Sequence, residues 1–309
     1  MLLPHEISDF AGAPNGSLVQ TRSLGATIRD YLSLLKLRIV LLLVATAVGA
    51  MLPAAHGWPR ALAVLAVILG GSLAAGGAHA INCWFDRDID AEMSRTRRRP
   101  IPDGRIPAWH ALVLGIALNL AAFAVLLSLA NLAAALLALT GTLIYVFVYT
   151  IWLKRTTPQN IVIGGAAGAI PPLVGWAGVT GGLDLTALAL FLVIFFWTPP
   201  HFWALAQMIR RDYERAHVPM LPVVGGEGSA KRQSLVYAVL TVCASLVPFF
   251  THAAGALYLA GAILLGAALV WLAALDLTRK GWTRRLWSFS MVYLAALFLV
   301  LAIGSFPTL

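Results

Sequence analysis

Residues 61–105 read ALAVLAVILGGSLAAGGAHAINCWFDRDIDAEMSRTRRRPIPDGR. The first part of this stretch, residues 61–82, contains no Asp, Glu, Lys or Arg. About 20 consecutive apolar residues are enough for a helix to cross a bilayer. Residues 86–105 then mix acidic and basic side chains. The stretch therefore predicts a transmembrane helix that ends in a charged loop at one face of a membrane.

The rest of the chain repeats this pattern. Its 309 residues are 60% hydrophobic and 11% charged, whereas soluble globular proteins carry about 25% charged residues. Since backbone groups in lipid must bond within their own segment, the apolar stretches are expected to be helices. The predicted spans are 39–56, 61–82, 109–129, 131–152, 160–179, 185–206, 233–252, 254–275 and 286–304. We expect an all-α, polytopic membrane bundle of about nine transmembrane helices, in which a cytoplasmic tail (1–35) precedes one intramembrane domain (36–309). No cleavable signal sequence is expected in the polar tail.

Lysine and arginine residues lie almost entirely in alternate loops. Of the 22 basic residues, only Arg60 falls on the other side. Because cytoplasmic loops of membrane proteins are enriched in Lys and Arg, this places the N-terminus in the cytoplasm and, after nine spans, the C-terminus outside. We expect a multi-pass protein of the cell inner (plasma) membrane. The net charge of +9 then belongs to one membrane face, where anionic lipid or an anionic substrate explains it better than nucleic acid.

Asn82, Asp86 and Asp90 follow one another at intervals of four residues at the end of the second predicted span. If the helix continues, such residues lie one above another on one face. Two Asp side chains at this spacing repel each other, so a divalent cation or the arginines within 95–99 should compensate them. Mg²⁺ takes oxygen ligands and is commonly shared between one or two carboxylates and substrate phosphates. The spacing suits an Mg²⁺-bridged diphosphate, and the alternative is a solvated loop with balanced charges.

A second group of polar residues follows the sixth predicted span. His201 lies eleven residues before Asp212, close to three helical turns, so both can share one helix face. Pro199 and Pro200 are expected to kink or restart the helix just before His201. A polar residue inside a span is a functional-site hypothesis by default, which applies to His201 and to His79. The alternative for each histidine is hydrogen-bonded packing.

The turn after the fourth predicted span is basic. Tyr149 lies near the inner end of that span, and Lys154 and Arg155 follow it. Both cations can reach a phosphate at the interface, arginine as a bidentate fork and lysine as a point charge. Plain anchoring of a cytoplasmic loop is the alternative for both. The small residues GGAAGA at 164–169 indicate close packing between helices.

Five longer strings of the chain are distinctive. They are NCWFDRDID (82–90), RTRRRPIP (95–102), NIVIGGAAGAIPPLVGWAGVTG (160–181), WTPPHFWALA (197–206) and DYERAHVPMLPV (212–223). In this order they resemble the UbiA superfamily of intramembrane prenyltransferases, and closely its heme-modifying branch, from about Leu34 to the last span. Many members of the wider superfamily have a second Asp four residues after the first in the later motif, where this chain has Ala216 after Asp212. The heme-modifying branch shares this reduced motif, which puts a second full metal site in doubt.

The resemblance implies a helical bundle around a central cavity that opens to the cytoplasm, with the loops after spans two and six as a cap. The implied reaction transfers the farnesyl group of farnesyl diphosphate to a vinyl group of heme b, giving heme O and diphosphate. The implied Mg²⁺ ligands are Asn82, Asp86, Asp90 and Asp212. The implied diphosphate-binding residues are Arg95, Arg98, Lys154 and Arg155. Tyr149 is expected to stabilise the allylic cation, and His79 and His201 are expected to bind heme. The resulting catalytic set is Asn82, Asp86, Asp90, Tyr149 and Lys154.

The expected partners are farnesyl diphosphate, heme b, the lipid bilayer and assembly partners of a terminal oxidase. Two other functions remain open. A related prenyltransferase acting on a quinone or chlorophyll precursor would use the same diphosphate site. A cation- or proton-coupled transporter would use Asp86, Asp90 and His201 as an ion path, but it predicts acids near the middle of the bilayer and paired broken helices.

Overall fold

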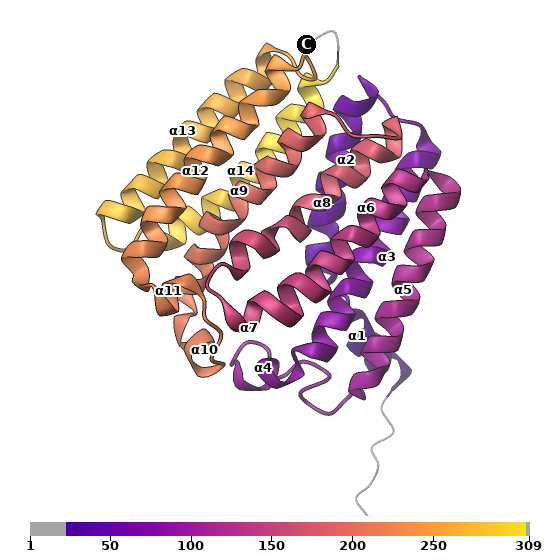
Figure 1. Cartoon of the computed structure of the whole chain (residues 1–309), viewed down its shortest axis with the longest axis vertical. Coiled ribbons are helices and arrows are strands. Elements are labelled where there is room, and N and C mark those ends of the chain that lie inside the picture. The colour runs from indigo at the N-terminus through magenta and orange to yellow at the C-terminus, as the bar shows by residue number, and fades with distance from the viewer. Residues whose placement is uncertain (1–22, 307–309) are drawn as a thin grey trace, which may run out of the picture.

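Nine long apolar helices form the body of the molecule. The computed structural model describes residues 23–306, and none of these residues forms a strand. Within this range nine helices are long and apolar enough to cross a membrane, which confirms the predicted all-α bundle (Figure 1). They are α2 (Leu37–Ala55), α3 (Ala61–Phe85), α5 (Ala108–Leu129), Leu132–Thr156, α8 (Asn160–Thr180), α9 (Leu185–Met208), α12 (Gly226–Phe250), α13 (Ala256–Thr278) and α14 (Thr283–Gly304).

The fourth of these spans has three parts. α6 (Leu132–Leu143) continues into a π-helix, η1 (Ile144–Leu153), and ends in the short helix α7 (Lys154–Thr156). In contrast, α9 runs from Leu185 to Met208 through Pro199 and Pro200. Of the two expected effects of these prolines, a kink or a restart before His201, the restart does not occur.

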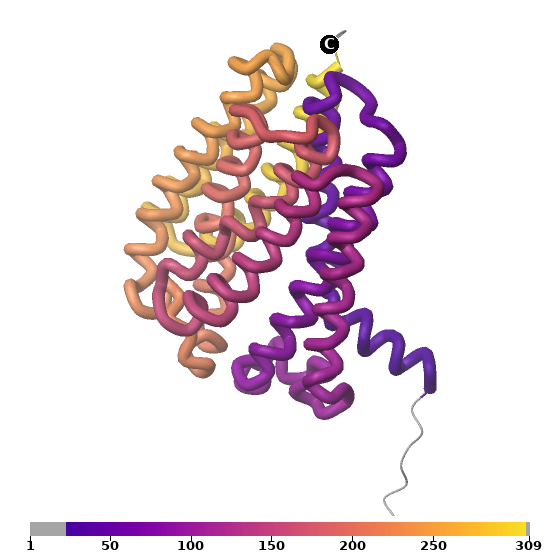
Figure 2. Tube along the Cα trace, turned by 45° about the vertical axis from the view of Figure 1, so that its right-hand side comes forward, coloured from indigo at the N-terminus to yellow at the C-terminus, as the bar shows by residue number. Residues whose placement is uncertain are grey.

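Short helices gather at one end of the bundle. α4 (Arg87–Glu92), α10 (Arg210–Arg215) and α11 (Leu221–Val224) lie beside α7 at the lower end in Figure 1, opposite the C-terminus. α1 (Leu24–Leu34) leaves the bundle at an angle at the same end, as Figure 2 shows. The charged loops of the sequence therefore fold into one structured face.

The predicted tail 1–35 is not entirely a separate segment. Its residues 1–22 lie outside the described part of the chain. The remainder forms α1, whose Leu34 is buried with Ala80 and Cys83 of α3 and with Ile101 and Ile106 of the following loop. The end of the tail thus packs against the base of α3, beside the predicted site.

Small residues let the helices approach one another closely. A Cβ at Gly77 of α3 would collide with Gly115 of α5, and a Cβ at Gly175 of α8 would collide with the backbone of Ala47 in α2. Without a hydrophobic driving force between helices in lipid, such close backbone contact is what holds membrane helices together. These contacts fix α3, which carries His79 and Asn82 of the predicted site, against α5, and they fix α8 against α2.

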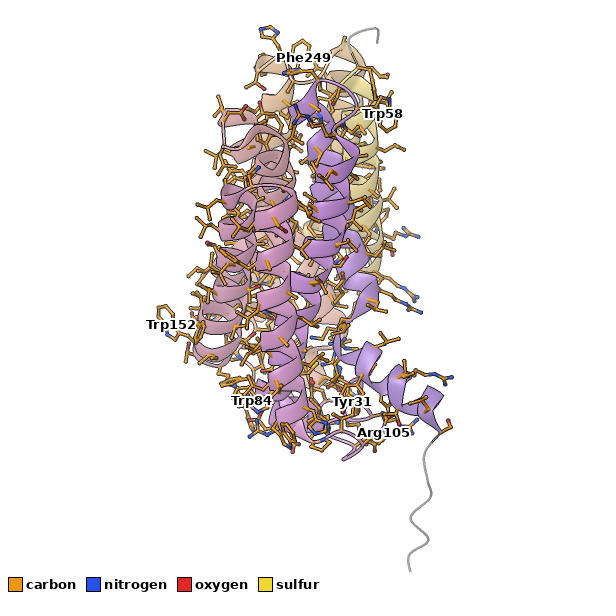
Figure 3. The ribbon with its side chains drawn as sticks, turned by 90° about the vertical axis from the view of Figure 1, so that its right-hand side faces the viewer. Tyr31, Trp58, Trp84, Arg105, Trp152 and Phe249 are labelled. Atoms are coloured by element: carbon orange, nitrogen blue, oxygen red, sulfur yellow. The ribbon has the colours of Figure 1, made fainter. Side chains whose placement is uncertain are left out.

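Tryptophan side chains mark both ends of the bundle. Figure 3 shows Trp58 at the upper end, and Trp84 and Trp152 toward the lower end, where Arg105 also lies. Trp58 and Trp152 are exposed. Tryptophan is enriched at the two interfaces of a bilayer, so this placement fits a multi-pass protein whose helices span between the two belts.

Candidate active site

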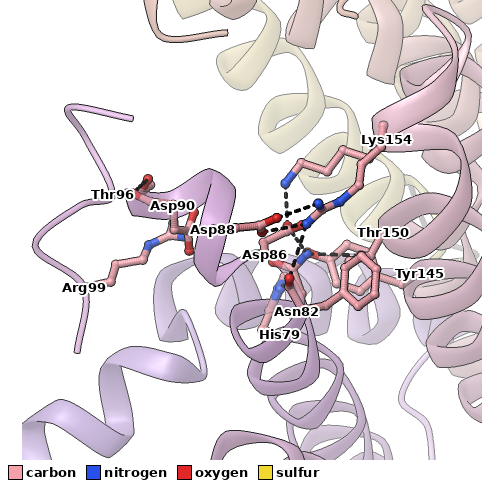
Figure 4. Close-up of polar contacts among 12 residues, drawn as sticks. His79, Asn82, Asp86, Asp88, Asp90, Thr96, Arg99, Tyr145, Thr150 and Lys154 are labelled. Atoms are coloured by element: carbon pink, nitrogen blue, oxygen red, sulfur yellow. Dashed lines mark hydrogen bonds and ion pairs between the residues drawn. The ribbon is translucent and has the colours of Figure 1, made fainter. Parts of the chain in front are cut away.

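The end of α3 carries the first two predicted ligands. Asn82 donates from Nδ2 to Asp86 Oδ2 (2.6 Å) and to Thr150 Oγ1 (3.1 Å), and its Oδ1 accepts from Lys36 Nζ (2.8 Å). α3 ends at Phe85, and Asp86 joins it to α4. Asn82 and Asp86 are therefore held side by side, with their side chains almost fully buried (Figure 4).

Asp86 lies between two cations of the α7 turn. Lys154 forms an ion pair with Oδ2 of Asp86, and Arg155 Nη2 lies 3.6 Å from Oδ1. Oδ1 is buried and has no hydrogen-bond partner. A buried carboxylate oxygen without a partner is unfavourable unless a ligand completes it. Among the predicted residues, this oxygen is therefore suited to accept a bond from a cation or a hydrogen-bond donor.

Arg155 also reaches outward. Its guanidinium donates to both oxygens of Asp88, each at 2.7 Å, and lies 4.8 Å from the ring centroid of Phe85. The hydrogen bonds from Arg155 lower the pKa of the exposed Asp88 carboxyl to about 2. Arg155 thus bridges the buried Asp86 and the surface. It lines a pocket of about 510 Å³ together with Arg215 and His217.

Asp90 is held separately from Asp86. Arg99 Nη1 donates to Asp90 Oδ2 at 2.7 Å, and the Thr96 hydroxyl donates to the Asp90 backbone carbonyl at 2.9 Å. Arg98, the predicted diphosphate ligand, is exposed and contributes its backbone carbonyl to Arg105. Within the arginine run, it is Arg99 that reaches the acidic residues.

The π-helix η1 brings four polar side chains to one face. A π-helix bonds residue i to residue i+5, so residues four, five and nine apart return to nearly the same side. Tyr145, Tyr149, Thr150 and Lys154 have this spacing, and the Lys154 N–H donates to the Tyr149 carbonyl in this pattern. In an α-helix the same residues would be spread around about half of the circumference.

Aromatic rings line the deeper side of this group. The rings of Tyr145 and Tyr149 stack with their centroids 5.6 Å apart. Gly164 of α8 makes room for Tyr149, because a Cβ there would collide with the Tyr149 ring. His79 lies one turn below Asn82, with Nδ1 3.2 Å from the Tyr145 hydroxyl, while its Nε2 is buried without a partner.

His201 belongs to a different cluster. Its ring stacks on Trp197 with the centroids 4.4 Å apart, and its Nδ1 lies 2.8 Å from the Ser290 hydroxyl. The ring of Trp287 of α14 is also stacked with that of His201, with the centroids 6.2 Å apart. No hydrogen bond or ring contact within residues 23–306 joins His201 to the Asn82–Asp86 pair. The two predicted heme-binding histidines therefore have separate surroundings.

Asp212 is bonded to Ser94, and no hydrogen bond within residues 23–306 joins it to Asn82, Asp86 or Asp90. Its carboxylate accepts from the Ser94 hydroxyl (2.8 and 2.9 Å) and from the Ser94 backbone N–H (3.4 Å). Burial opposes ionisation of Asp212, but these bonds outweigh it and lower the pKa of the carboxyl. Arg95, predicted to bind diphosphate, follows Ser94 and is exposed.

Four residues of the site were missed by sequence reasoning, namely Lys36, Arg99, Tyr145 and Thr150. Arg99 was assigned only to charge compensation, and Lys36 only to topology. Lys36 has a left-handed backbone conformation (φ 52°) at the junction between α1 and α2, which turns its side chain toward Asn82. Burial lowers the pKa of its ammonium group. The one signal in the sequence was a lysine placed directly before an apolar span, a feature that many membrane proteins share.

The assembled site carries excess positive charge. Four cations surround the buried carboxylates of Asp86 and Asp90, namely Lys36, Arg99, Lys154 and Arg155. Within residues 23–306 no three His, Cys, Asp or Glu side chains gather closely enough to hold a metal by themselves. The oxygens of Asn82 and Asp86, including the unpartnered Oδ1, fit Mg²⁺ only if an anionic substrate supplies further ligands.

Residues 42–300 match the UbiA prenyltransferase family. The chain is 51% identical over 279 residues to a protoheme IX farnesyltransferase of Roseiflexus sp. (strain RS-1), an alignment that covers 89% of this chain and 52% of that protein. It is 52% identical over 288 residues to the protoheme IX farnesyltransferase of Gloeobacter violaceus, covering 91% of this chain and 93% of that one. The chain thus spans about half the length of the first of these curated relatives and nearly all of the second.

Solved structures share the fold at low sequence identity. A structure of digeranylgeranylglyceryl phosphate synthase superposes with a TM-score of 0.76 at 19% identity, covering 91% of this chain and 99% of that chain. A UbiA homolog from Archaeoglobus fulgidus bound to GPP and Mg²⁺ superposes with a TM-score of 0.65 at 18% identity, covering 88% and 99%. The helical arrangement is therefore that of the UbiA homologs.

Proposed function

Because this chain belongs to the UbiA prenyltransferase family, we propose that it transfers the farnesyl group of farnesyl diphosphate to a vinyl group of heme b. The names of the relatives at about 50% identity support this acceptor. The observation that carries the proposal is the buried Asp86 carboxylate, which lies between Lys154 and Arg155, has one oxygen without a hydrogen-bond partner, and adjoins Asn82, to which Lys36 donates. A prenyl diphosphate combines the negative charge and the apolar tail that such a site within a membrane bundle would accept.

The basic residues bind and orient the diphosphate. Lys154 and Arg155 would turn from Asp86 to phosphate oxygens, while Lys36 and Arg99 would approach from the other side of Asn82 and Asp90. Asn82 and Asp86, with Asp90 beside them, would hold Mg²⁺, which when bound neutralises negative charge on the leaving diphosphate. Hydrogen-bond donors that are already in place stabilise that charge at little reorganisation cost.

The farnesyl carbon becomes cationic as the bond to diphosphate breaks. The stacked rings of Tyr145 and Tyr149 lie beside the polar group and offer electron-rich faces to such a cation. A vinyl group of heme b then attacks the allylic carbon, and water adds to the resulting cation with loss of a proton. The products are heme O and diphosphate, so atoms and charge balance.

Two histidines support a heme substrate. The unpartnered Nε2 of His79 is suited to an iron ligand, since its Nδ1 is already occupied by the Tyr145 hydroxyl. His201, which is stacked with Trp197 and with Trp287, would instead pack against the porphyrin or serve as a second iron ligand. We assign the more direct role to His79 because it lies one turn from Asn82.

The proposed reaction takes place at the cytoplasmic end of the bundle. The N-terminus lies in the cytoplasm and the C-terminus outside the inner membrane, because the basic loops belong to the end that carries α4, α7 and α10. Farnesyl diphosphate and diphosphate are exchanged at that end, and heme b and heme O pass to neighbouring membrane proteins. Assembly proteins of a terminal oxidase are the expected recipients.

Pigment analysis of membranes tests this function. Membranes that overproduce the chain should accumulate heme O, detected by chromatography and mass, whereas the Asp86→Asn variant at equal protein level should not. Asp103→Asn, which changes an exposed acid of the loop after α4, is the matched control and should retain activity. A prenylated quinone precursor in place of heme O would assign the chain to a different acceptor.

A further inference from the structure

Helix α1 exposes a row of large apolar side chains. Leu24, Ile28 and Leu32 are 76%, 50% and 45% exposed, and they follow one another at intervals of four residues. Residues at this spacing lie on one face of a helix. A contiguous apolar row at the surface of a protein marks a site that binds a membrane or another protein. The direction in which this row points decides between the two.

Leu35 shows which way the row points. It directly follows α1 and keeps helical backbone angles, so at about 100° per residue it lies on the same face as Leu24 and Ile28. Its side chain lies against Gly76 of α3, where an added Cβ would be 3.6 Å from the Leu35 Cβ. Gly76 is inside the span, nine residues before α3 ends at Phe85. The face of α1 that carries the apolar row therefore points toward the interior of the membrane.

The opposite face of α1 points toward the charged loop after α4. Asp30 is two residues after Ile28, which places it about 160° away around the helix. It forms an ion pair with Arg105 of that loop. The Tyr31 hydroxyl lies 2.5 Å from Nδ1 of His110 at the start of α5. Figure 3 shows Tyr31 and Arg105 at the lower end of the bundle. These contacts hold α1 with its polar side toward the loop and its apolar row away from it.

The next helix continues the same apolar surface. α2 begins at Leu37, directly after the junction, and it exposes Leu41 and Leu42 at 68% and 63%. Because α2 is long and apolar enough to cross a membrane, these exposed side chains face lipid acyl chains. Arg29 and Arg38 are exposed on the two sides of the junction. Arginine near a bilayer extends its guanidinium group to the lipid phosphates, so a lipid surface fits both the apolar row and its charged flanks.

We propose that α1 is an interfacial helix that docks on the bilayer surface through Leu24, Ile28 and Leu32. A helix of this kind lies in the plane of the interface, with its apolar face among the upper parts of the acyl chains. Docking also positions Lys36, because α1 ends just before the left-handed junction from which Lys36 reaches Asn82. The docking does not depend on the proposed farnesyl transfer. Its effect on the affinity for farnesyl diphosphate rests on that function.

Fluorescence quenching by lipids tests the docking without any substrate. The protein is placed in nanodiscs with the exposed Cys243 replaced by Ala, and the buried Cys83 is kept. A bimane label is attached at Ile28→Cys or, as the matched control, at Ser33→Cys, an exposed position on the polar side of α1. Phosphatidylcholine with a nitroxide on its acyl chain should quench the label at 28 about threefold more strongly, because only that face contacts acyl chains. Equal quenching at the two positions, or stronger quenching at 33, would overturn the proposal.

Substitution of the apolar row tests its effect on Lys36. In the variant Leu24→Ser/Ile28→Ser, the KM for farnesyl diphosphate should rise about tenfold and kcat should change less than about twofold, since a hydrogen bond from a charged donor is weakened. The variant Leu24→Ile/Ile28→Leu keeps the apolar area and should keep the KM of the wild type. An unchanged KM in the serine variant, or a loss of kcat alone, would show that α1 does not position Lys36. Because the quenching needs no turnover, it tests the docking even if farnesyl diphosphate is not the substrate.

Discussion

Asp86 is the residue on which the site is organised. It is almost fully buried at the joint between α3 and α4, and it contacts Asn82, Lys154 and Arg155. A buried carboxylate is tolerated only when paired and hydrogen-bonded. Its Oδ1, 3.6 Å from Arg155 Nη2, nevertheless has no hydrogen-bond partner. A carboxylate oxygen can accept a cation such as Mg²⁺, and we expect the basic side chains around Asp86 to favour an anion that the cation would bridge.

Substitution of Lys36 tests whether this residue binds the diphosphate. Lys36→Met removes the charge near Asn82 and keeps the length of the side chain, so the KM for farnesyl diphosphate should rise about 10- to 100-fold, as expected for loss of a hydrogen bond to a charged group. Steady-state kinetics at saturating acceptor measure this change. Lys280→Met, an exposed lysine at the same end of the molecule, is the control and should leave KM unaltered. An unaltered KM in Lys36→Met would exclude Lys36 from the diphosphate site.

Among the helices, the π-helix η1 (Ile144–Leu153) has the most unusual geometry. It turns Tyr145, Tyr149, Thr150 and Lys154 toward the end of α3, and it does so beside α8, where Gly164 leaves space for the Tyr149 ring. π-Helical turns are rare and are often found at functional sites. The arrangement explains how one span supplies both the aromatic wall and a cation of the site.

Gly164→Ala tests this packing. The new Cβ would collide with Tyr149 and push its ring out of place, so kcat should fall at least tenfold and the unfolding temperature should drop, since overpacking costs roughly 1–3 kcal/mol. Gly168→Ala on the same helix is the matched control, because a Cβ there meets nothing within 4 Å. Turnover and thermal unfolding of both purified variants measure whether activity and stability depend on the packing of Tyr149 against Gly164. Equal activity in the two would show that the position of Tyr149 is unimportant.

The sequence predicted some elements well and others not at all. The nine spans were predictable because length and hydropathy alone determine where a chain can cross a bilayer. The Asn82–Asp86 contact was also predictable, since the i, i+4 spacing on a helix brings side chains together. The π-helix was not, because an α-helical spacing of its residues places them on different faces. Lys36–Asn82 and Ser94–Asp212 are tertiary contacts, and no local pattern specifies them.

At the scale of the whole molecule, the two ends of the bundle differ. One end holds α1, α4, α7, α10 and α11, and the other carries the C-terminus, as Figure 1 shows. The exposed Trp58 marks the second end. This asymmetry matches the distribution of basic residues, from which we expect the end with α4 to face the cytoplasm.

Labelling of single cysteines checks that orientation. In a variant with Cys83 and Cys243 replaced by Ala, Trp58→Cys should react with a membrane-impermeant maleimide added to the outside of sealed cells or spheroplasts. Arg97→Cys should react only after the membrane is permeabilised. The two positions are exposed and lie at opposite ends. The reverse pattern would invert the topology and place the diphosphate site on the outer face.

The acceptor of the farnesyl group distinguishes heme O synthesis from prenylation of a quinone precursor. The most direct measurement supplies the purified protein in lipid nanodiscs with Mg²⁺ and farnesyl diphosphate, and offers heme b and 4-hydroxybenzoate as alternative acceptors. We expect heme O and an equal amount of diphosphate to form, without prenylated 4-hydroxybenzoate. After Mg²⁺ is chelated, we expect no product. Prenylated 4-hydroxybenzoate without heme O would contradict this expectation.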